Sequence, residues 1–220
     1  MQKYAEELNT NLFCIGEDFS YTRQENKTWS FKTAKLNWED LPMPSLYGRA
    51  QLSNAATALM GTVCIDEQLP VTRECVGAGL SNISLPGRFQ VLQSDCQVVL
   101  DVAHNLDSAE VLVENLKELD SATKNIAVFA VLADKDVDGI IDAIKHIFDE
   151  WHISELDSER TFAAEKLHKV LTKYCPESNV YSHPTITAAY ACAKQNVDAS
   201  MRIVVFGSFL TVAEVLRQEV

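Results

Sequence analysis

An arginine, an aspartate and a histidine lie close together along the chain, around one short apolar run. Residues 98–100 read as a buried strand, and the chain then continues as Asp101-Val102-Ala103-His104-Asn105. Arg88 lies upstream, directly after a Pro-Gly pair that favours a tight turn. A guanidinium matches phosphate oxygens, a carboxylate can accept hydrogen bonds from ribose hydroxyls, and an imidazole can exchange a proton with an amine. These residue types indicate a site for a nucleotide and an incoming amine.

Each of these three residues also has a purely structural interpretation. Arg88 could be a surface arginine in an ion pair, Asp101 a carboxylate that caps the next helix, and His104 a histidine that only forms structural hydrogen bonds. In a parallel α/β sheet, however, ligands bind at the carboxyl ends of the strands. That position and the Pro-Gly turn favour a binding role for Arg88, while both interpretations of Asp101 stay open.

Alternating strands and helices would hold these residues in place. From about residue 85 onward, five apolar runs are predicted to be strands, namely 98–100, 126–132, 151–155, 179–181 and 202–206. Between them apolar residues recur at helical spacing, and Asp107 followed by Glu110 predicts a helix that starts just after His104 and Asn105. Repeated strand-helix units predict an α/β fold with a Rossmann-like, doubly wound and mostly parallel sheet.

A second glycine-containing turn follows the last predicted strand. Gly207 would let the backbone approach a ligand, and the helix that begins near Ser208 could receive a carboxylate at its N-terminus. Ser208 could equally be a plain N-cap of that helix.

The first 84 residues show a different pattern. We expect a short strand at 12–15, a hairpin formed by 20–23 and 28–31, and helices at about 46–65 and 72–80. The change of pattern predicts two domains, 1–84 and 85–220, with a boundary near Leu85.

Composition narrows the classes of function. The chain has 220 residues, of which 47% are hydrophobic and 23% are charged, and this is typical of a globular protein. A net charge of -12 argues against non-specific binding to nucleic acid or to an anionic membrane. No apolar run reaches the length of a membrane span, so we expect a cytoplasmic protein.

The remaining cysteine, histidine and acidic residues are interpreted as structural. The six cysteines are scattered without a C-x-x-C pair, which favours reduced thiols packed as small apolar side chains. The four histidines other than His104 show no ligand spacing, so no metal ligand is expected in this chain. Asp134-Lys135-Asp136 is interpreted as a solvated turn with Asp136 as N-cap, and a contact of this loop with substrate stays open.

Five motifs together resemble a known family. They are Gln51–Ala56, Pro86-Gly87-Arg88-Phe89, Asp101–Asn105, Ala133–Asp136 and Phe206–Phe209. In order and spacing they resemble the C-terminal half of the folylpolyglutamate synthase/dihydrofolate synthase family of the Mur ligase superfamily. The resemblance covers nearly the whole chain. It implies a Mur ligase C-terminal domain at 85–220, preceded by the tail of the central ATPase domain at 1–84.

The resemblance also implies roles for individual residues. Arg88 would contact the ATP phosphates, while Asp101 and Asn54 would contact the bound nucleotide. His104 and Ser208 would be the catalytic residues on the glutamate side.

The implied reaction is ATP-dependent ligation of L-glutamate to dihydropteroate or to folate polyglutamates through an acyl phosphate. ATP, Mg²⁺ and these small molecules would be the cofactors and substrates, and the full-length enzyme is expected to be a monomer. No G-x-x-x-x-G-K-[ST] occurs in the chain, and in the family the phosphate loop and the Mg²⁺ ligands lie upstream of the region resembled here. We therefore expect these 220 residues to be inactive alone. Two alternatives stay open: another Mur-type amino-acid ligase, acting on a peptidoglycan precursor, and a non-catalytic nucleotide-binding remnant.

Overall fold

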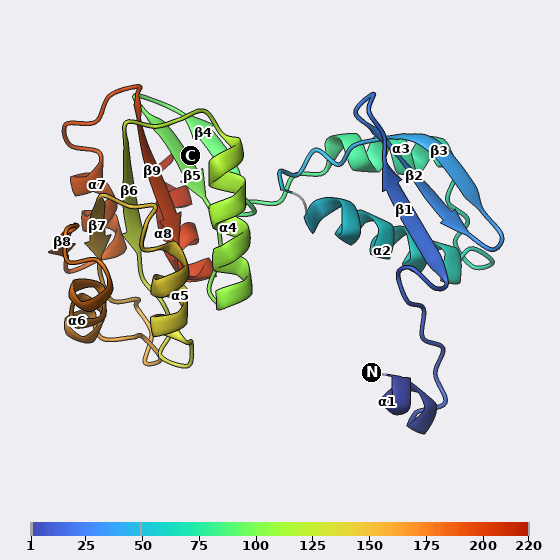
Figure 1. Ribbon diagram of the computed structural model, residues 1–220, viewed down its shortest axis with the longest axis horizontal. Helices are drawn as coiled ribbons and strands as arrows, with labels where there is room; N and C mark the ends of the chain where they lie inside the picture. The colour runs from blue at the N-terminus through green and yellow to red at the C-terminus, as the bar shows by residue number, and fades with distance from the viewer. Residues whose placement is uncertain (1, 49, 220) are drawn as a thin grey trace. The chain divides into compact units, whose positions relative to one another are not determined.

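The computed structural model describes residues 2–48 and 50–219, and the chain divides into two compact units, Met1–Ser84 and Leu85–Val220 (Figure 1). Each unit has a hydrophobic core cluster of its own. Among the described residues, the helices are too short or too polar to cross a membrane.

The first unit is built on a three-stranded antiparallel sheet. Its elements are α1 (Gln2–Glu7), β1 (Phe19–Arg23), β2 (Thr28–Thr33), β3 (Asn37–Pro42), α2 (Ala50–Cys64) and α3 (Arg73–Asn82), with the strands in the order β1-β2-β3. Trp29 and Phe31 on the central strand are completely buried, and apolar residues of α2 and α3 pack against them. The predicted hairpin and the two predicted helices are confirmed.

The predicted strand at 12–15 is wrong. Ile15 forms only an isolated bridge with Phe19, and Leu12, Phe13 and Ile15 are exposed. A short apolar run has no strand preference of its own when neither of its faces is covered.

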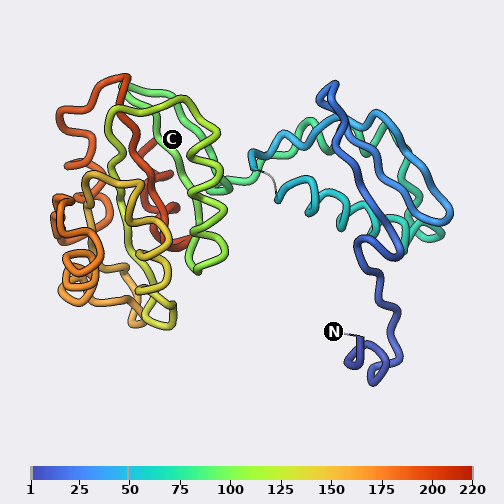
Figure 2. The backbone as a smooth tube through the Cα atoms, in the orientation of Figure 1, coloured from blue at the N-terminus to red at the C-terminus, as the bar shows by residue number. Residues whose placement is uncertain are grey.

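The second unit is a six-stranded sheet with helices on both faces. Its strands are β4 (Gln90–Gln93), β5 (Gln97–Leu100), β6 (Lys124–Phe129), β7 (Glu150–Ile153), β8 (Asn179–Ser182) and β9 (Met201–Phe206). Their order is β4-β5-β9-β6-β7-β8, and every pair is parallel except β4 with β5. Figure 2 shows how the last strand, β9, runs between β5 and β6. The predicted α/β fold with a mostly parallel sheet is confirmed.

Five helices cover this sheet. They are α4 (Leu106–Glu118), α5 (Val137–Ile144), α6 (Ala164–Tyr174), α7 (Ile186–Ala193) and α8 (Phe209–Glu219). Helices α4, α5 and α6 neighbour one another on one face, and α7 and α8 lie together on the other (Figure 1). Alternate residues of the strands therefore face one or the other helical layer, and in the inner strands β5, β6, β7 and β9 both sets are mostly buried, as in parallel sheets generally.

Helix α4 starts where the sequence predicted, but a different pair of residues caps it. The Oδ1 atom of Asn105 accepts a hydrogen bond from the Ser108 N–H (2.9 Å), and the Ser108 hydroxyl oxygen accepts one from the Asn105 N–H (3.1 Å). Asp107 and Glu110 both lie inside the helix, so the capping box assigned to them was wrong. An asparagine at the N-cap satisfies the first free N–H groups of the helix at least as well as an aspartate.

Candidate active site

The carboxyl ends of β5 and β9 are joined beyond the strands themselves. The Asp101 N–H donates to the Val205 carbonyl (3.0 Å), and the Gly207 N–H donates to the Ala103 carbonyl (2.9 Å). These two bonds fix the turn after β5 against the turn after β9. Asp101, His104 and Ser208 are thereby held at one edge of the sheet, as expected for a ligand site in a parallel α/β fold.

Arg88 projects from a turn that only glycine allows. Gly87 has φ of +73°, and a Cβ atom there would lie 2.8 Å from Cγ1 of Val212 and 3.1 Å from Cγ1 of Val102. The Gly87 carbonyl accepts a hydrogen bond from the Val102 N–H (2.9 Å), which ties this turn to the residue after Asp101. The Arg88 side chain is exposed, and its Cζ lies 5.4 Å from the centre of the Phe209 ring. A permanently charged guanidinium is thus presented to solvent from a rigid base.

The Asp101 carboxylate is held by backbone N–H groups. Its Oδ1 accepts from Ala103 (2.7 Å) and its Oδ2 from Phe89 (2.9 Å), so the aspartate bridges the Arg88 turn and the turn after β5. Burial raises the pKa of Asp101 to about 6, against the lowering effect of these N–H groups, of Arg88 and of His104. Asp101 therefore does not cap α4, whose N-cap is Asn105, but backbone N–H groups satisfy its carboxylate as the structural interpretation expected.

His104 is oriented by its own loop. Its Nδ1 lies 2.8 Å from the Val102 carbonyl oxygen, and because a carbonyl can only accept, Nδ1 carries the proton. In the neutral ring the lone pair is then on Nε2, the form that a proton acceptor needs. The His104 N–H also donates to the Ser108 hydroxyl (3.0 Å), so the start of α4 fixes the backbone under the ring.

Ser208 caps helix α8 and is buried. Its Oγ accepts from the Thr211 N–H (3.1 Å) and lies 3.1 Å from Oγ1 of Thr211. Thr211 donates its own hydroxyl proton to the Ala130 carbonyl (2.8 Å), so the Ser208 hydroxyl is the donor in the pair. The Ser208 hydroxyl thus both donates and accepts a hydrogen bond within the protein, which agrees with the interpretation of Ser208 as the N-cap of the helix.

Phe209 is a further candidate site residue, for which the sequence predicted no role of its own. Its ring is 57% exposed although phenylalanine is usually buried, and its centre lies 6.4 Å from that of the His104 ring as well as close to Arg88. An exposed aromatic face beside a guanidinium offers a flat apolar surface to a ligand. The residue belongs to the 206–209 motif, but only the fold shows that it lies against two other candidate residues.

Two other predicted positions have hydrogen-bond partners of their own. Asn54 is exposed on α2 in the first unit, where its Nδ2 donates to Oε1 of Gln51 (3.3 Å). In the 134–136 loop, Asp136 caps α5 by accepting from the Gly139 N–H (3.0 Å), and Asp134 pairs with Arg160 (3.0 Å). These bonds agree with the solvated-turn interpretation of the loop.

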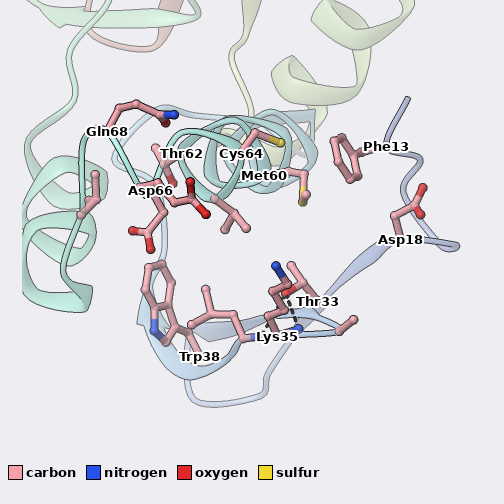
Figure 3. Close-up of a pocket in the computed structure, with 15 residues that line it drawn as sticks. Phe13, Asp18, Thr33, Lys35, Trp38, Met60, Thr62, Cys64, Asp66 and Gln68 are labelled. Atoms are coloured by element: carbon pink, nitrogen blue, oxygen red, sulfur yellow. Dashed lines mark hydrogen bonds between the residues drawn. The ribbon is translucent and has the colours of Figure 1, made fainter. Parts of the chain in front are cut away.

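A separate cavity of about 670 Å³ lies within the first unit (Figure 3). It is lined by Lys35 in the turn between β2 and β3, by Trp38 of β3, by Met60 of α2, and by Asp66 just after that helix. None of the predicted site residues lines this cavity.

Comparison with known proteins identifies the family of this chain. Residues 87–209 match the family described as Mur ligase, glutamate ligase domain, and the chain belongs to that family. The match contains the Arg88 turn, both strand ends and Phe209.

Within that family, the chain is similar to dihydrofolate synthase/folylpolyglutamate synthase over nearly all its length. It is 33% identical to the protein of that name from Buchnera aphidicola over 98% of this chain and 50% of the relative. The structure of Escherichia coli FolC in complex with DHPP and ADP superposes with a TM-score of 0.85 at 31% identity, over 99% of this chain and 50% of that one. A bifunctional folylpolyglutamate synthase/dihydrofolate synthase with Mn, AMPPNP and L-glutamate bound gives 0.84 at 31% identity, over the same shares. The chain thus spans about half the length of the relatives that it matches.

Proposed function

We propose that this chain forms the C-terminal side of an ATP-dependent ligase that joins L-glutamate to dihydropteroate or to a folate. The observation that carries the proposal is the Arg88–Asp101–His104 group at the edge of the sheet, in a chain similar throughout to proteins of that activity. The whole reaction also needs groups that this chain does not carry, such as a phosphate loop.

In the proposed reaction, ATP transfers its γ-phosphoryl group to a substrate carboxylate, giving an acyl phosphate and ADP. The amino group of glutamate then attacks the acyl carbon, phosphate leaves, and the amine loses a proton. Arg88 would stabilise the negative charge on the phosphoryl oxygens, and Asp101 would accept hydrogen bonds from the nucleotide. The Nε2 atom of His104 would position the amine and accept its proton.

Ser208 would not contact the reacting atoms in this reaction but would hold the start of helix α8 in place. By capping α8 it fixes the N-terminus of that helix, whose free N–H groups favour a carboxylate such as that of glutamate. Asn54, in the first unit, would contact the nucleotide from the part of the chain that we assign to the tail of the ATPase domain.

The residues of this site do not fit a Mg²⁺ ion. Each oxygen of the Asp101 carboxylate already accepts a backbone N–H, and the groups around it are a guanidinium, an imidazole and a phenyl ring. A hard divalent cation prefers several oxygen ligands. We therefore expect the ligands of the ATP-bound metal to lie outside this chain.

The cysteines that the structure describes are free thiols, which fits an enzyme of the reducing cytoplasm.

The proposal is tested with a chimaeric ligase in which this chain replaces the matching half of the Escherichia coli protein. Glutamate ligation to dihydropteroate is followed by mass spectrometry of the product. Arg88→Ala should lower kcat/KM by about 100-fold or more, because a donor to the transferring phosphoryl group is lost. Arg217→Ala, which removes an exposed arginine of α8 paired with Glu214, is the matched control and should change kcat/KM by less than about twofold.

Near-normal turnover of the Arg88→Ala chimaera would contradict the assignment. A product formed only from a nucleotide-linked muropeptide would favour another Mur-type ligase instead. A folded chimaera that binds ADP yet forms neither product would favour the non-catalytic remnant.

A further inference from the structure

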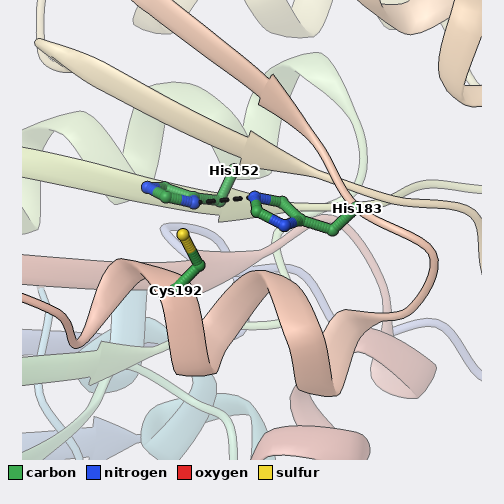
Figure 4. A group of neighbouring side chains, drawn as sticks. All are labelled: His152, His183 and Cys192. Atoms are coloured by element: carbon green, nitrogen blue, oxygen red, sulfur yellow. Dashed lines mark hydrogen bonds between the residues drawn. The ribbon is translucent and has the colours of Figure 1, made fainter.

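Two histidines and a cysteine from three different elements meet on the face of the second unit that α7 covers. His152 comes from β7, His183 directly follows β8, and Cys192 lies on α7 (Figure 4). One ligand atom from each side chain lies within 4.8 Å of the other two. The sequence shows no ligand spacing for these two histidines, and the fold places their ring nitrogens within hydrogen-bond distance of one another.

Strand pairing holds the backbone of His152 and of His183 in place. In the parallel register His152 lies between Val128 and Tyr181, and Val128 belongs to the core cluster that also contains Ala189 of α7. The His183 N–H donates to the Ile153 carbonyl (2.8 Å), which extends the β7–β8 pairing to the second histidine. Both imidazoles are thus on well-anchored backbone.

A carboxylate orients the buried histidine. His152 is only 2% exposed, and its Nε2 lies 2.7 Å from Oε1 of Glu150, whose Oε2 is paired with Nζ of Lys124 at 2.7 Å. Since the carboxylate accepts, Nε2 of the neutral ring carries the proton and Nδ1 has the lone pair. That lone pair is directed to Nε2 of His183, 2.9 Å away. A carboxylate on the far nitrogen of an imidazole is the usual support of a metal-binding histidine.

We propose that Nδ1 of His152, Nε2 of His183 and Sγ of Cys192 bind a zinc ion. Two imidazole nitrogens and a thiolate suit this borderline-soft cation, which takes nitrogen at about 2.0–2.1 Å and sulfur at about 2.3 Å. A tetrahedral ion needs its two nitrogens about 3.3 Å apart, so the rings separate slightly from 2.9 Å and the sulfur moves inward from the 4.8 Å limit.

Binding replaces a proton at two positions. The thiol of Cys192 releases its proton to solvent, and His183 stays neutral by carrying its proton on Nδ1 instead of Nε2. The fourth ligand position has room for water, because a cavity of about 240 Å³ is lined by His152 and Cys192 together with polar side chains such as Gln195 and Asn196.

This zinc site is distinct from the candidate active site. His152 and His183 belong to β7 and the end of β8, whereas Asp101 and Ser208 follow β5 and β9, and β6 lies between β9 and β7. The inference therefore does not depend on the proposed ligase activity.

The test uses the 220-residue chain, free of any histidine tag and stripped of metal by chelation. Zn²⁺ affinity is measured by competition with a chromophoric chelator, and Co²⁺ is used as the spectroscopic probe. We expect one equivalent of metal, a thiolate-to-cobalt charge-transfer band and a rise in Tm with zinc.

Cys192→Ser and His183→Gln should each weaken binding at least about tenfold, and Cys192→Ser should abolish the charge-transfer band. Glu150→Gln should weaken binding about 10- to 100-fold while the band remains, because it removes only the support of His152. Cys75→Ser and His146→Gln, both at exposed positions, are the matched controls and should bind as the parent chain does. Circular dichroism of each variant verifies that it is folded.

Three results would overturn the proposal. They are the absence of the thiolate band, zinc affinity unchanged in folded Cys192→Ser, and loss of binding in a control variant. Each would mean that His152 and His183 form only a hydrogen-bonded pair.

Discussion

The pKa of the Asp101 carboxyl is subject to two opposing effects. Burial disfavours the carboxylate, whereas two N–H groups and two nearby basic side chains favour it, and the pKa is raised to about 6 from an ordinary value of 3.8. A carboxyl with a higher pKa in the folded chain than in the unfolded one binds its proton more tightly when folded. Its contribution to stability is therefore fully present below about pH 4 and is lost as the pH rises through about 6.

This shift predicts a pH-dependent difference between the parent chain and Asp101→Asn. Between about pH 4 and about pH 7 the free energy of unfolding of the parent should fall, relative to the variant, by on the order of 3 kcal/mol. Urea unfolding at several pH values measures this difference, and comparison with the variant removes the contributions of the other carboxylates. A difference that is flat with pH, or a carboxyl NMR signal of Asp101 that titrates below pH 4, would contradict it.

Residue type and local sequence were enough to single out Arg88 and Asp101 as candidates. Both lie in or beside turns that the sequence shows directly, a Pro-Gly pair and the end of an apolar run. The role of Ser208 stayed open because a serine after a glycine is equally suited to cap a helix or to bind a ligand. The pairing of His152 with His183 could not be found, because 31 positions separate them and only the β7–β8 register brings them together.

At the scale of elements, Gly207 determines how closely β9 and β6 can end together. It has φ of +111°, and a Cβ atom at this position would lie 2.3 Å from the Ala130 carbonyl oxygen and 2.6 Å from the Phe129 ring. Gly207→Ala should therefore lower the free energy of unfolding by at least about 2 kcal/mol.

Gly79→Ala is the matched control for this substitution. It lies inside helix α3, where an added Cβ meets no atom within 4 Å, so it should raise stability by roughly 0.5–1 kcal/mol. Urea unfolding of both variants checks the pair. Equal effects of the two substitutions would show that the close approach of β9 and β6 has no energetic importance.

The cap of α4 supports a second prediction at this scale. Asn105→Ala removes the acceptor of the Ser108 N–H and should cost about 1 kcal/mol, whereas Asn105→Asp keeps an acceptor and should cost only a few tenths. Thermal unfolding followed by circular dichroism distinguishes the two variants. If aspartate were as destabilising as alanine, the hydrogen bond to Ser108 would not be the source of the effect.

Elements with strong apolar or periodic patterns were predictable, whereas the strands β3 and β4 were not. The inner strands β5, β6 and β9 contain continuous apolar runs, which is typical of strands buried on both faces. In contrast, β4 begins and ends with glutamine, and β3 contains Asn37, Glu39 and Asp40 and ends at a proline, so neither resembles a strand in isolation. Pairing with β5 and with β2 creates these two strands.

For the whole molecule, the main prediction concerns activity. The 220 residues alone should form no ADP from ATP in the presence of dihydropteroate and glutamate, because no phosphate loop occurs in their sequence. A coupled assay of ADP release measures this, with the Escherichia coli protein as the positive control. Measurable ligation by these residues alone would contradict the proposal that the reaction needs a phosphate loop that they do not carry.

The two edges of the six-stranded sheet have a consequence for how the protein behaves in concentrated solution. The edge strands β4 and β8 are only four residues long each, whereas β6 and β9, inside the sheet, have six. An exposed edge is a template on which another polypeptide can add a strand and begin to aggregate, and a short edge offers few unpaired backbone groups for this. The arrangement that places the longest strands at the centre therefore also protects the second unit against self-association through its sheet.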